Sequence, residues 1–405
     1  MSKLLSSFPR AFWVLLVLYF FNRIASSFIW PFISLFAVEQ TGEPLAHVTP
    51  LLSLQAVTSL LGTSVISALM DRFGRKKAMI LGMVVYAGVL LGMSGSTHLW
   101  QWALLIVLYG ISQPMFMVGA NAMVADLVVE EKRTDAYAIL RTIANVTIAI
   151  GPAISGLLIT HSPLLAYYTT AAISLLLVVP SYLFLQETLA RPGDSSPQSG
   201  AGFTAILRDT RFVVFCGVYA VLEIGIAMVF SLLGVYVKEN FNILENEYGL
   251  LLSVNALMVV FFQYAMTRLT KRFPPFTVLA VGALFYMAGL LTFGTSSLLL
   301  HFALGMAVLT TGELLVAPTA TAQVANMAPP DKRARYMGIY SLLYSIGAGI
   351  GPSIGGVLSG SIAPSAIWYG AALATLLAAV GFALMPRLWR TKQPVEEDIA
   401  VVEIS

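Results

Sequence analysis

The chain repeats itself with an offset of 200 residues, and the two copies align without gaps over most of their length. Residues 133–158 align with residues 333–358, so that Gly151-Pro152 falls on Gly351-Pro352. Two fused, similar halves are the architecture of many secondary transporters, in which the substrate lies between the halves near the middle of the bilayer. The repeat therefore predicts two related halves around a shared cavity.

The composition is that of an integral membrane protein. Apolar residues make up 58% of the chain and charged residues only 11%, whereas an ordinary globular protein carries about 25% charged residues. Many apolar stretches exceed the roughly 20 residues that a helix needs to cross the hydrocarbon. We expect an all-α membrane fold with twelve helices in two six-helix halves, the spans being 12–38, 48–70, 78–96, 100–127, 136–160, 164–186, 212–238, 247–270, 276–296, 299–327, 336–360 and 364–386.

The basic residues predict the orientation in a plasma or inner membrane. With a cytoplasmic N-terminus, all of the 23 lysines and arginines except Lys238, Arg23 and Arg141 fall in inner segments, as the positive-inside rule requires. Both termini are thus expected in the cytoplasm. The net charge of +3 follows from this sidedness and does not indicate nucleic-acid binding.

The repeat and the apolar spans divide the chain into four parts. We expect a first six-helix half over 1–190, a cytoplasmic linker over 191–210, a second half over 211–388 and a cytoplasmic tail over 389–405. The linker is rich in Gly, Pro and Ser, a composition typical of flexible connections. Each chain contains both sides of the cavity, so a monomer suffices, with membrane lipids as its surroundings.

A charged motif lies between the second and third spans, where residues 67–77 read SALMDRFGRKK. Gly74 is the residue expected in a tight turn. Asp71 lies among several cations and predicts an ion-pair network. Partners for such a network stand at the inner ends of spans four and five, and the candidate latch comprises Asp71, Arg72, Gly74, Arg75, Asp126 and Arg141.

Spans five and eleven each contain a Gly-Pro pair followed by small residues. Proline removes a helix hydrogen bond, and small residues let helices approach closely. We therefore expect packing pivots rather than substrate contacts at Gly151, Pro152 and Gly156, and at Gly351, Pro352, Gly355 and Gly356.

Together these motifs resemble the major facilitator superfamily. Residues 67–77 are similar to its cytoplasmic loop signature, and the Gly-Pro segments look like the signature of its antiporter branch. Within the superfamily the chain is most similar to the twelve-span drug:proton antiporters, and its residues 312–318 (GELLVAP) resemble a segment of multidrug members. The resemblance implies that the latch residues hold an outward-open state. The group's usual arginine in span four is missing here, where residues 107–110 read VLYG.

Three ionisable residues lie deep within predicted spans, namely Arg23, Glu223 and Glu313. An ion there costs at least about 2.5–3.5 kcal/mol, so such residues normally face a cavity and pair with a partner. Under the repeat, Arg23 is opposite Glu223 and Gln113 is opposite Glu313. We expect Arg23 to pair with a cavity acid, and Glu313 and Glu223 to carry coupling protons. The alternative is a static Arg23–Glu223 pair with a permanently protonated Glu313.

The remaining candidates for the cavity are neutral. Intramembrane amides that could line it or tune its acids include Asn22, Gln113, Asn121, Asn145 and Asn255. Soft and aromatic side chains suit bulky amphiphiles because they repack around different shapes, and the candidates for substrate lining are Trp30, Phe116, Met117, Met228, Phe230, Met258 and Phe261. No residues have the spacing of a metal site, and no cofactor is expected.

The sequence thus predicts a proton-coupled secondary exporter of hydrophobic or amphiphilic, often cationic, small molecules, with the proton gradient as its energy source. A lipid or glycolipid translocator and a dedicated metabolite exporter are alternatives that would use the same cavity. A transporter-like receptor without turnover is an alternative of another class. No catalytic motif occurs in a suitable context, so an enzyme is not expected.

Overall fold

The computed structural model describes residues 8–188, 206, 208–329 and 332–390, and it contains no strand within these ranges. The helices of the first half are α2 Arg10–Ser27, the 3-10 turn η1 Trp30–Phe32, α3 Ile33–Thr41, α4 Leu45–Phe73, α5 Arg75–Ser94, α6 Leu99–Leu127, α7 Glu130–His161 and α8 Pro163–Phe184. Those of the second half are α10 Thr210–Phe241, α11 Glu245–Thr270, α12 Pro275–Thr295, α13 Leu299–Met327, α14 Arg333–Ser361 and α15 Ala366–Arg390.

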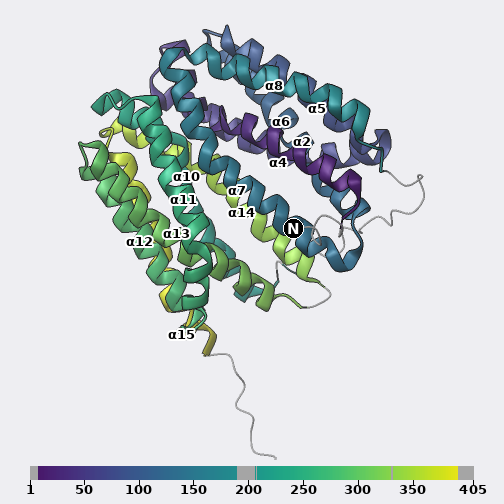
Figure 1. Cartoon of the computed structure of the whole chain (residues 1–405). Coiled ribbons are helices and arrows are strands. Elements are labelled where there is room, and N and C mark those ends of the chain that lie inside the picture. Colours follow the sequence, from purple (N-terminus) through teal and green to yellow (C-terminus); the bar gives the residue numbers. More distant parts are fainter. Residues whose placement is uncertain (1–7, 189–205, 207, 330–331, 391–405) are drawn as a thin grey trace, which may run out of the picture.

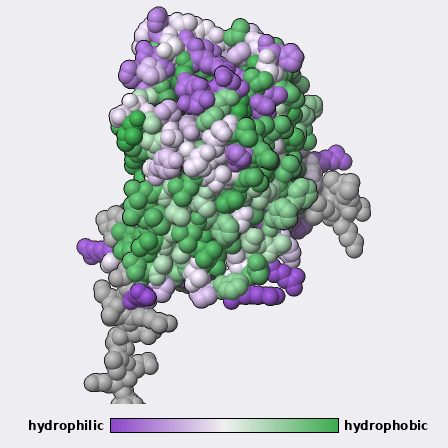
Figure 2. All heavy atoms as spheres, turned by 90° about the vertical axis from the view of Figure 1, so that its left-hand side faces the viewer, coloured by the Kyte–Doolittle hydropathy of each residue, from purple (hydrophilic) through white to green (hydrophobic). Residues whose placement is uncertain are grey.

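Twelve membrane spans are confirmed. Each of the expected apolar stretches corresponds to a segment long and apolar enough to cross a bilayer, and the outer surface carries a wide hydrophobic region with hydrophilic residues gathered toward its ends (Figure 2). Most of the expected linker and the tail from residue 391 lie outside the described residues. The second half begins within the range expected for the linker, because Asp209 caps α10 by accepting hydrogen bonds from the backbone N–H groups of Arg211 and Phe212.

The first span differs from the single helix expected over 12–38. It is broken into α2, η1 and α3, with Pro31 inside η1. Proline has no N–H to donate and clashes with the preceding turn, so the helix is interrupted there. The break lies eight residues beyond Arg23, at the level where the two halves meet through Trp30 and Phe230, whose ring centroids are 6.4 Å apart.

The two halves lie side by side, with α7, α10, α11 and α14 between them (Figure 1). Packing between the halves runs through α4 against α14, α7 against α11, and η1 and α3 against α10. The pairs α4–α14 and α7–α11 correspond to each other under the sequence repeat. The arrangement of the helices is therefore consistent with the two related halves that the sequence repeat predicts.

Contacts between the halves concentrate at one end of the molecule. We call the end with Arg75 and Arg268 the basic end, and the end with Glu39 and Lys238 the far end. One buried apolar cluster contains residues of both halves, and at the far end it includes Phe36 of the first half and Tyr248 of the second. A second cluster, near the basic end, contains only residues of the first half. The halves are therefore tied together at the far end.

Polar contacts of α4 with α14 lie toward the same end. The Ser53 hydroxyl donates to the backbone carbonyl of Gly349 and lies 2.7 Å from the hydroxyl of Ser353. Where α3 packs against α10, the Ser34 hydroxyl donates to the Ser231 carbonyl at 2.5 Å.

The predicted pivot glycines all lie at close helix contacts. A Cβ on Gly156 would come within 2.6 Å of the Glu245 carbonyl oxygen, and one on Gly356 would meet Thr49, so these two face the opposite half. Gly151 faces Ser27, Gly351 faces Ile224 and Gly355 faces Leu232, all within their own half. Pro152 and Pro352 lie inside α7 and α14. A role of these positions in motion remains a prediction.

Candidate functional site

Arg23 lies in the middle of the first span, on α2. Its Nη1 is 3.8 Å from the sulfur of Met117 on α6, and its buried Nε has no hydrogen-bond partner. No ion pair of Arg23 occurs among the described residues, so this conformation shows neither the expected pair with a cavity acid nor the alternative static pair with Glu223.

Glu313 lies in the middle of α13 and is bound to a neutral amide. The Nδ2 of Asn255, on α11, donates to Glu313 Oε2 at 2.7 Å and to Thr310 Oγ1 at 2.9 Å. The Thr310 hydroxyl donates in turn to the Met306 carbonyl at 2.7 Å. Asn255 was expected from the sequence as a cavity residue, and the structure places it on the predicted coupling acid. No cation pairs with Glu313 in the described part of the chain.

Glu223 lies on α10 beside the backbone of α14. A Cβ on Gly347 would come within 2.7 Å of the Glu223 carbonyl, so α10 and α14 approach closely there. The charge of Glu313 acts on the Glu223 carboxyl group. The two predicted coupling acids thus share one region of the second half.

Tyr344 on α14 connects this region with Arg23. Both Glu223 and Arg23 lie within electrostatic range of its hydroxyl, and its side chain is 68% exposed. Sequence reasoning missed it, although its place three residues before Gly347 and eight before Pro352 could have directed attention to this face of α14.

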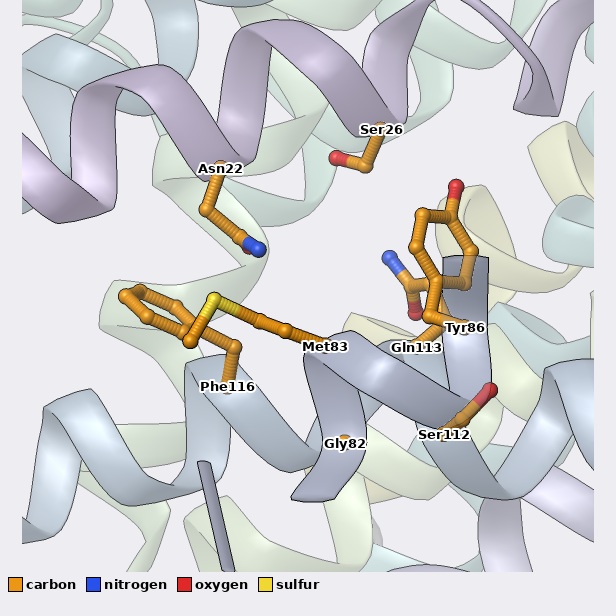
Figure 3. A pocket seen from close by; sticks show the side chains of 8 residues that line it. All are labelled: Asn22, Ser26, Gly82, Met83, Tyr86, Ser112, Gln113 and Phe116. Atoms are coloured by element: carbon orange, nitrogen blue, oxygen red, sulfur yellow. The ribbon is translucent and has the colours of Figure 1, made fainter. Parts of the chain in front are cut away.

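A polar pocket lies in the first half, between α2, α5 and α6. It is lined by Asn22, Ser26, Gly82, Met83, Tyr86, Ser112, Gln113 and Phe116 (Figure 3). Three of these residues, Asn22, Gln113 and Phe116, were expected to line a cavity. Figure 3 shows the side chains of Asn22 and Ser26 extending from α2 toward those of α5 and α6.

The other expected lining residues are distributed less regularly. Met117 contacts Arg23, and Trp30 faces Phe230 across the halves. Met228 is buried in packing at 1% exposure, so it does not line a cavity here, whereas Phe261 is 70% exposed on α11. Of the remaining candidates, Met258 and Asn145 are half-buried and Asn121 is exposed, its backbone carbonyl accepting from the Tyr137 hydroxyl at 3.0 Å.

The loop between α4 and α5 forms a charged network with two other segments. Gly74 has φ 98°, as the expected tight turn requires. Arg75 makes an ion pair with Asp126 at the end of α6. The carboxylate of Glu187, just after α8, accepts the backbone N–H groups of Arg75 at 2.9 Å and Lys76 at 3.2 Å, where the positive end of the α5 dipole favours an anion.

These contacts join α5, α6 and the end of α8, all in the first half. Thr188 completes the network by donating to Asp126 at 2.6 Å. Arg72 stacks over its neighbour Phe73 at 5.3 Å, and Arg141 is exposed with no ion pair among the described residues. The side chain of Asp71 lies outside the described residues. Glu187 was missed because it follows the last apolar residue of a span, where acids are common.

A second charged cluster ties the halves at the far end. Lys238 of α10 contacts the carboxylates of Glu39 on α3 and Glu245 on α11. Glu245 is 7% exposed, so this contact is largely shielded from water. The sequence singled out Lys238 as the lone basic residue on its side, but it did not reveal its partners.

Comparison with known proteins agrees with this architecture. The family model of the Major Facilitator Superfamily matches residues 15–224 and 215–401. The chain is 28% identical over 368 residues to a "Na(+), Li(+), K(+)/H(+) antiporter" of Planococcus maritimus, covering 83% of this chain and 86% of that one. It is 25% identical over 224 residues to "Multidrug resistance protein 1" of Bacillus subtilis, covering 54% and 56%.

The fold is also similar to that of a solved transporter. The crystal structure of the nucleoside transporter NupG superposes with a TM-score of 0.82 at 12% identity, covering 94% of this chain and 100% of that one. With the family match over nearly the whole chain, the twelve spans and the two related halves, the chain belongs to the Major Facilitator Superfamily and is a membrane transporter, not an enzyme.

Proposed function

We propose that this protein is a proton-coupled exporter of hydrophobic or amphiphilic small molecules that works by alternating access. The observation that carries the proposal is the setting of Glu313, whose carboxyl group is held by the neutral amide of Asn255 in the middle of a span. An unpaired ion inside the membrane is costly. A carboxyl group at that depth without a cationic partner therefore takes up a proton, and it can release the proton when it is exposed to water.

The proton gradient supplies enough energy for export. One pH unit is worth about 1.4 kcal/mol per proton, and 100 mV is worth about 2.3 kcal/mol per charge. Either suffices for at least tenfold accumulation against a gradient. Glu223, in electrostatic range of Glu313, is the second proposed coupling acid, because a proton on one of the two changes the cost of charging the other.

The direction of loading follows from the orientation. The basic end carries nearly all lysines and arginines outside the spans, and the positive-inside rule places such an end in the cytoplasm. The far end, where the halves are joined, then faces the outside of the plasma or inner membrane. In this conformation, the described contacts close the outer side, and a compound would enter from the cytoplasm.

One relative supports proton antiport, and another supports drug export. One is named as an alkali cation/proton antiporter and another as a multidrug resistance protein. The first name favours a second candidate function, exchange of a monovalent cation for protons, in which Glu223 and Glu313 would bind the cation and the proton in turn. Both candidates use the same acids, but only one needs an organic substrate.

A reconstituted system separates the two candidates. Purified protein in liposomes, with a proton gradient imposed, is expected to transport the lipophilic cation ethidium only while the gradient lasts. Glu313→Gln should lower gradient-driven transport at least tenfold, and Glu43→Gln, an acid in the far-end connection between α3 and α4, should leave it unchanged. A proton flux that requires sodium or potassium and does not change when ethidium is added would favour cation exchange. Ethidium flux indifferent to both the gradient and Glu313→Gln would contradict the proposal.

A further inference from the structure

The Thr310 hydroxyl fixes which atom of the Asn255 amide faces Glu313. The Nδ2 of Asn255 lies 2.9 Å from the Thr310 hydroxyl and 2.7 Å from Glu313 Oε2. The single hydrogen of the Thr310 hydroxyl is used in its 2.7 Å bond to the Met306 carbonyl, so this hydroxyl can only accept from the amide. Both hydrogens of Nδ2 are therefore engaged, one on Thr310 and the other on the Glu313 carboxyl group.

This hydrogen bond stabilises the ionised carboxylate more than the protonated carboxyl group. An N–H donor binds an ionised acceptor about twice as strongly as a neutral one. Asn255 is 6% exposed and Thr310 is fully buried, so water competes little for these groups. The amide could accept a hydrogen bond from a protonated Glu313 only after turning over, and the Thr310 hydroxyl would then have to leave Met306.

No cation assists the amide in the part of the chain that the structure describes. Glu313 has no ion pair there, and the bond from Asn255 is the only hydrogen bond that its carboxyl group makes among those residues. The titratable groups of this region are Tyr219 and Glu223 on α10, Tyr286 on α12, and Tyr340 and Tyr344 on α14. None of them carries a positive charge, so the Asn255 amide is the group that stabilises an ionised Glu313.

The acid and the orienting hydroxyl are both departures from the internal repeat. Glu313 aligns with Gln113 of the first half. Thr310 aligns with Gly110. The helices α4 and α6, which correspond to α11 and α13, pack against each other without these two groups. Packing of the two helices therefore does not require the arrangement, and its presence in the second half alone favours a role in the chemistry of the acid.

We propose that Asn255 is a positioning residue for release of the coupling proton from Glu313, and that Thr310 fixes its orientation. On release, the O–H bond of the carboxyl group breaks, water on the cytoplasmic side takes the proton, and the remaining carboxylate accepts the Asn255 N–H. The inference rests on the proposed role of Glu313 and deepens it by naming the groups that allow the proton to leave. Without the amide, Glu313 would retain its proton, and the carrier would behave like Glu313→Gln.

The test compares Asn255→Leu with Gln263→Leu in liposomes that contain labelled ethidium. Gln263, further along α11, also bonds α13, because its amide donates to the Leu314 carbonyl at 3.2 Å, so it is the matched control for a bridge between the two helices. Asn255→Leu is expected to lower gradient-driven net transport about tenfold, since a hydrogen bond to a charged group is lost. Exchange of labelled for unlabelled ethidium at equilibrium should continue, because it needs no proton release. Gln263→Leu should leave both activities unchanged.

A change of pH separates a positioning role from a structural one. The pH on both sides is raised together, so that the difference across the membrane stays constant. Net transport by Asn255→Leu should then recover toward that of the wild type, because a higher pH favours proton release, whereas Glu313→Gln has no proton to release and should not recover. Thr310→Val should show a weaker form of the Asn255→Leu defect, and Thr310→Ser, which keeps the hydroxyl, should behave as the wild type.

Three results would overturn the assignment of Asn255. They are net transport by Asn255→Leu equal to that of the wild type, an equal loss in Asn255→Leu and Gln263→Leu, and a loss that a higher pH does not relieve. In each case, a defect confined to net transport in Glu313→Gln would leave the proposed function standing. Ethidium transport by the wild type that ignores the gradient would overturn both. If Asn255→Leu also loses exchange and is therefore misfolded, equal net transport by Thr310→Val and Thr310→Ser would overturn the assignment.

Discussion

Gly74 holds the turn between α4 and α5 in a conformation that other residues adopt only with strain. Its φ of 98° and ψ of 151° lie in a region that is accessible essentially to glycine alone. A Cβ at this position would also meet the Glu187 carboxyl group, with the Cδ 2.8 Å away. The single residue thus permits both the turn and the carboxylate at the start of α5.

Replacing this glycine is expected to be costly. Gly74→Ala should lower the free energy of unfolding by about 1–3 kcal/mol, because the backbone is strained and the Glu187 carboxylate is displaced. Thermal unfolding in detergent measures the change. Gly88→Ala on α5, where an added Cβ meets nothing within 4 Å, is the matched control and should be neutral or slightly stabilising. Equal melting temperatures for the two variants would contradict this role of Gly74.

Single residues were predicted from the sequence better than their partners were. Gly74, Asn255 and Glu313 stood out because glycine in a charged turn and polar groups inside apolar spans are unusual. The bond between Asn255 and Glu313 could not be predicted, because it depends on the rotation of α11 against α13. Tyr86, which lines the pocket of the first half, was missed because a tyrosine in an apolar span is ordinary.

At the scale of helices, the contact of Lys238 with Glu39 and Glu245 joins α10 to α3 and α11. The three side chains come from both halves, so the contact must break when the far end opens. Removing the cation leaves two acids facing each other, one of them 7% exposed, and like charges in such a place repel.

The contribution of the Lys238 contact can be tested by measuring the fraction of molecules whose far end is open. Lys238→Gln is expected to weaken far-end closure by about 1–2 kcal/mol, which corresponds to a five- to thirty-fold shift toward the open form. Spin labels on cysteines at His47 and Ser361, in a background without Cys216, report the distance between the far ends of α4 and α14. A distance distribution unchanged by Lys238→Gln would mean that this contact does not hold the far end closed.

The helices themselves were largely predictable, because apolar length decides a membrane span. The break at Trp30–Phe32 was not, since an apolar pattern continues across it and many membrane helices tolerate a proline without breaking. The latch residues Arg75 and Asp126 were recognised from the sequence, but the contact of Glu187 with the start of α5 was not. A charged motif in the sequence does not predict in which conformation of the transporter its ion pairs form.

At the scale of the whole molecule, the sequence repeat becomes a pair of equivalent contacts, α4 with α14 and α7 with α11. Both include close approaches toward the far end, where Gly156 and Gly356 face the opposite half. Rocking of the two halves about these contacts would close the basic end as the far end opens. We propose that proton binding by Glu313 controls when the molecule changes between the two conformations.

The most direct test of this account compares net transport with exchange in the same liposomes. In net export, the substrate-free carrier must return with a proton bound and release that proton on the inside. In exchange of labelled for unlabelled substrate at equilibrium, the carrier crosses in both directions with substrate bound, and no proton needs to dissociate. Glu313→Gln mimics a permanently protonated acid. The account predicts that gradient-driven net transport falls at least tenfold while exchange of labelled ethidium continues. Loss of both activities to the same extent in a folded variant, or retention of both, would contradict a coupling role for Glu313.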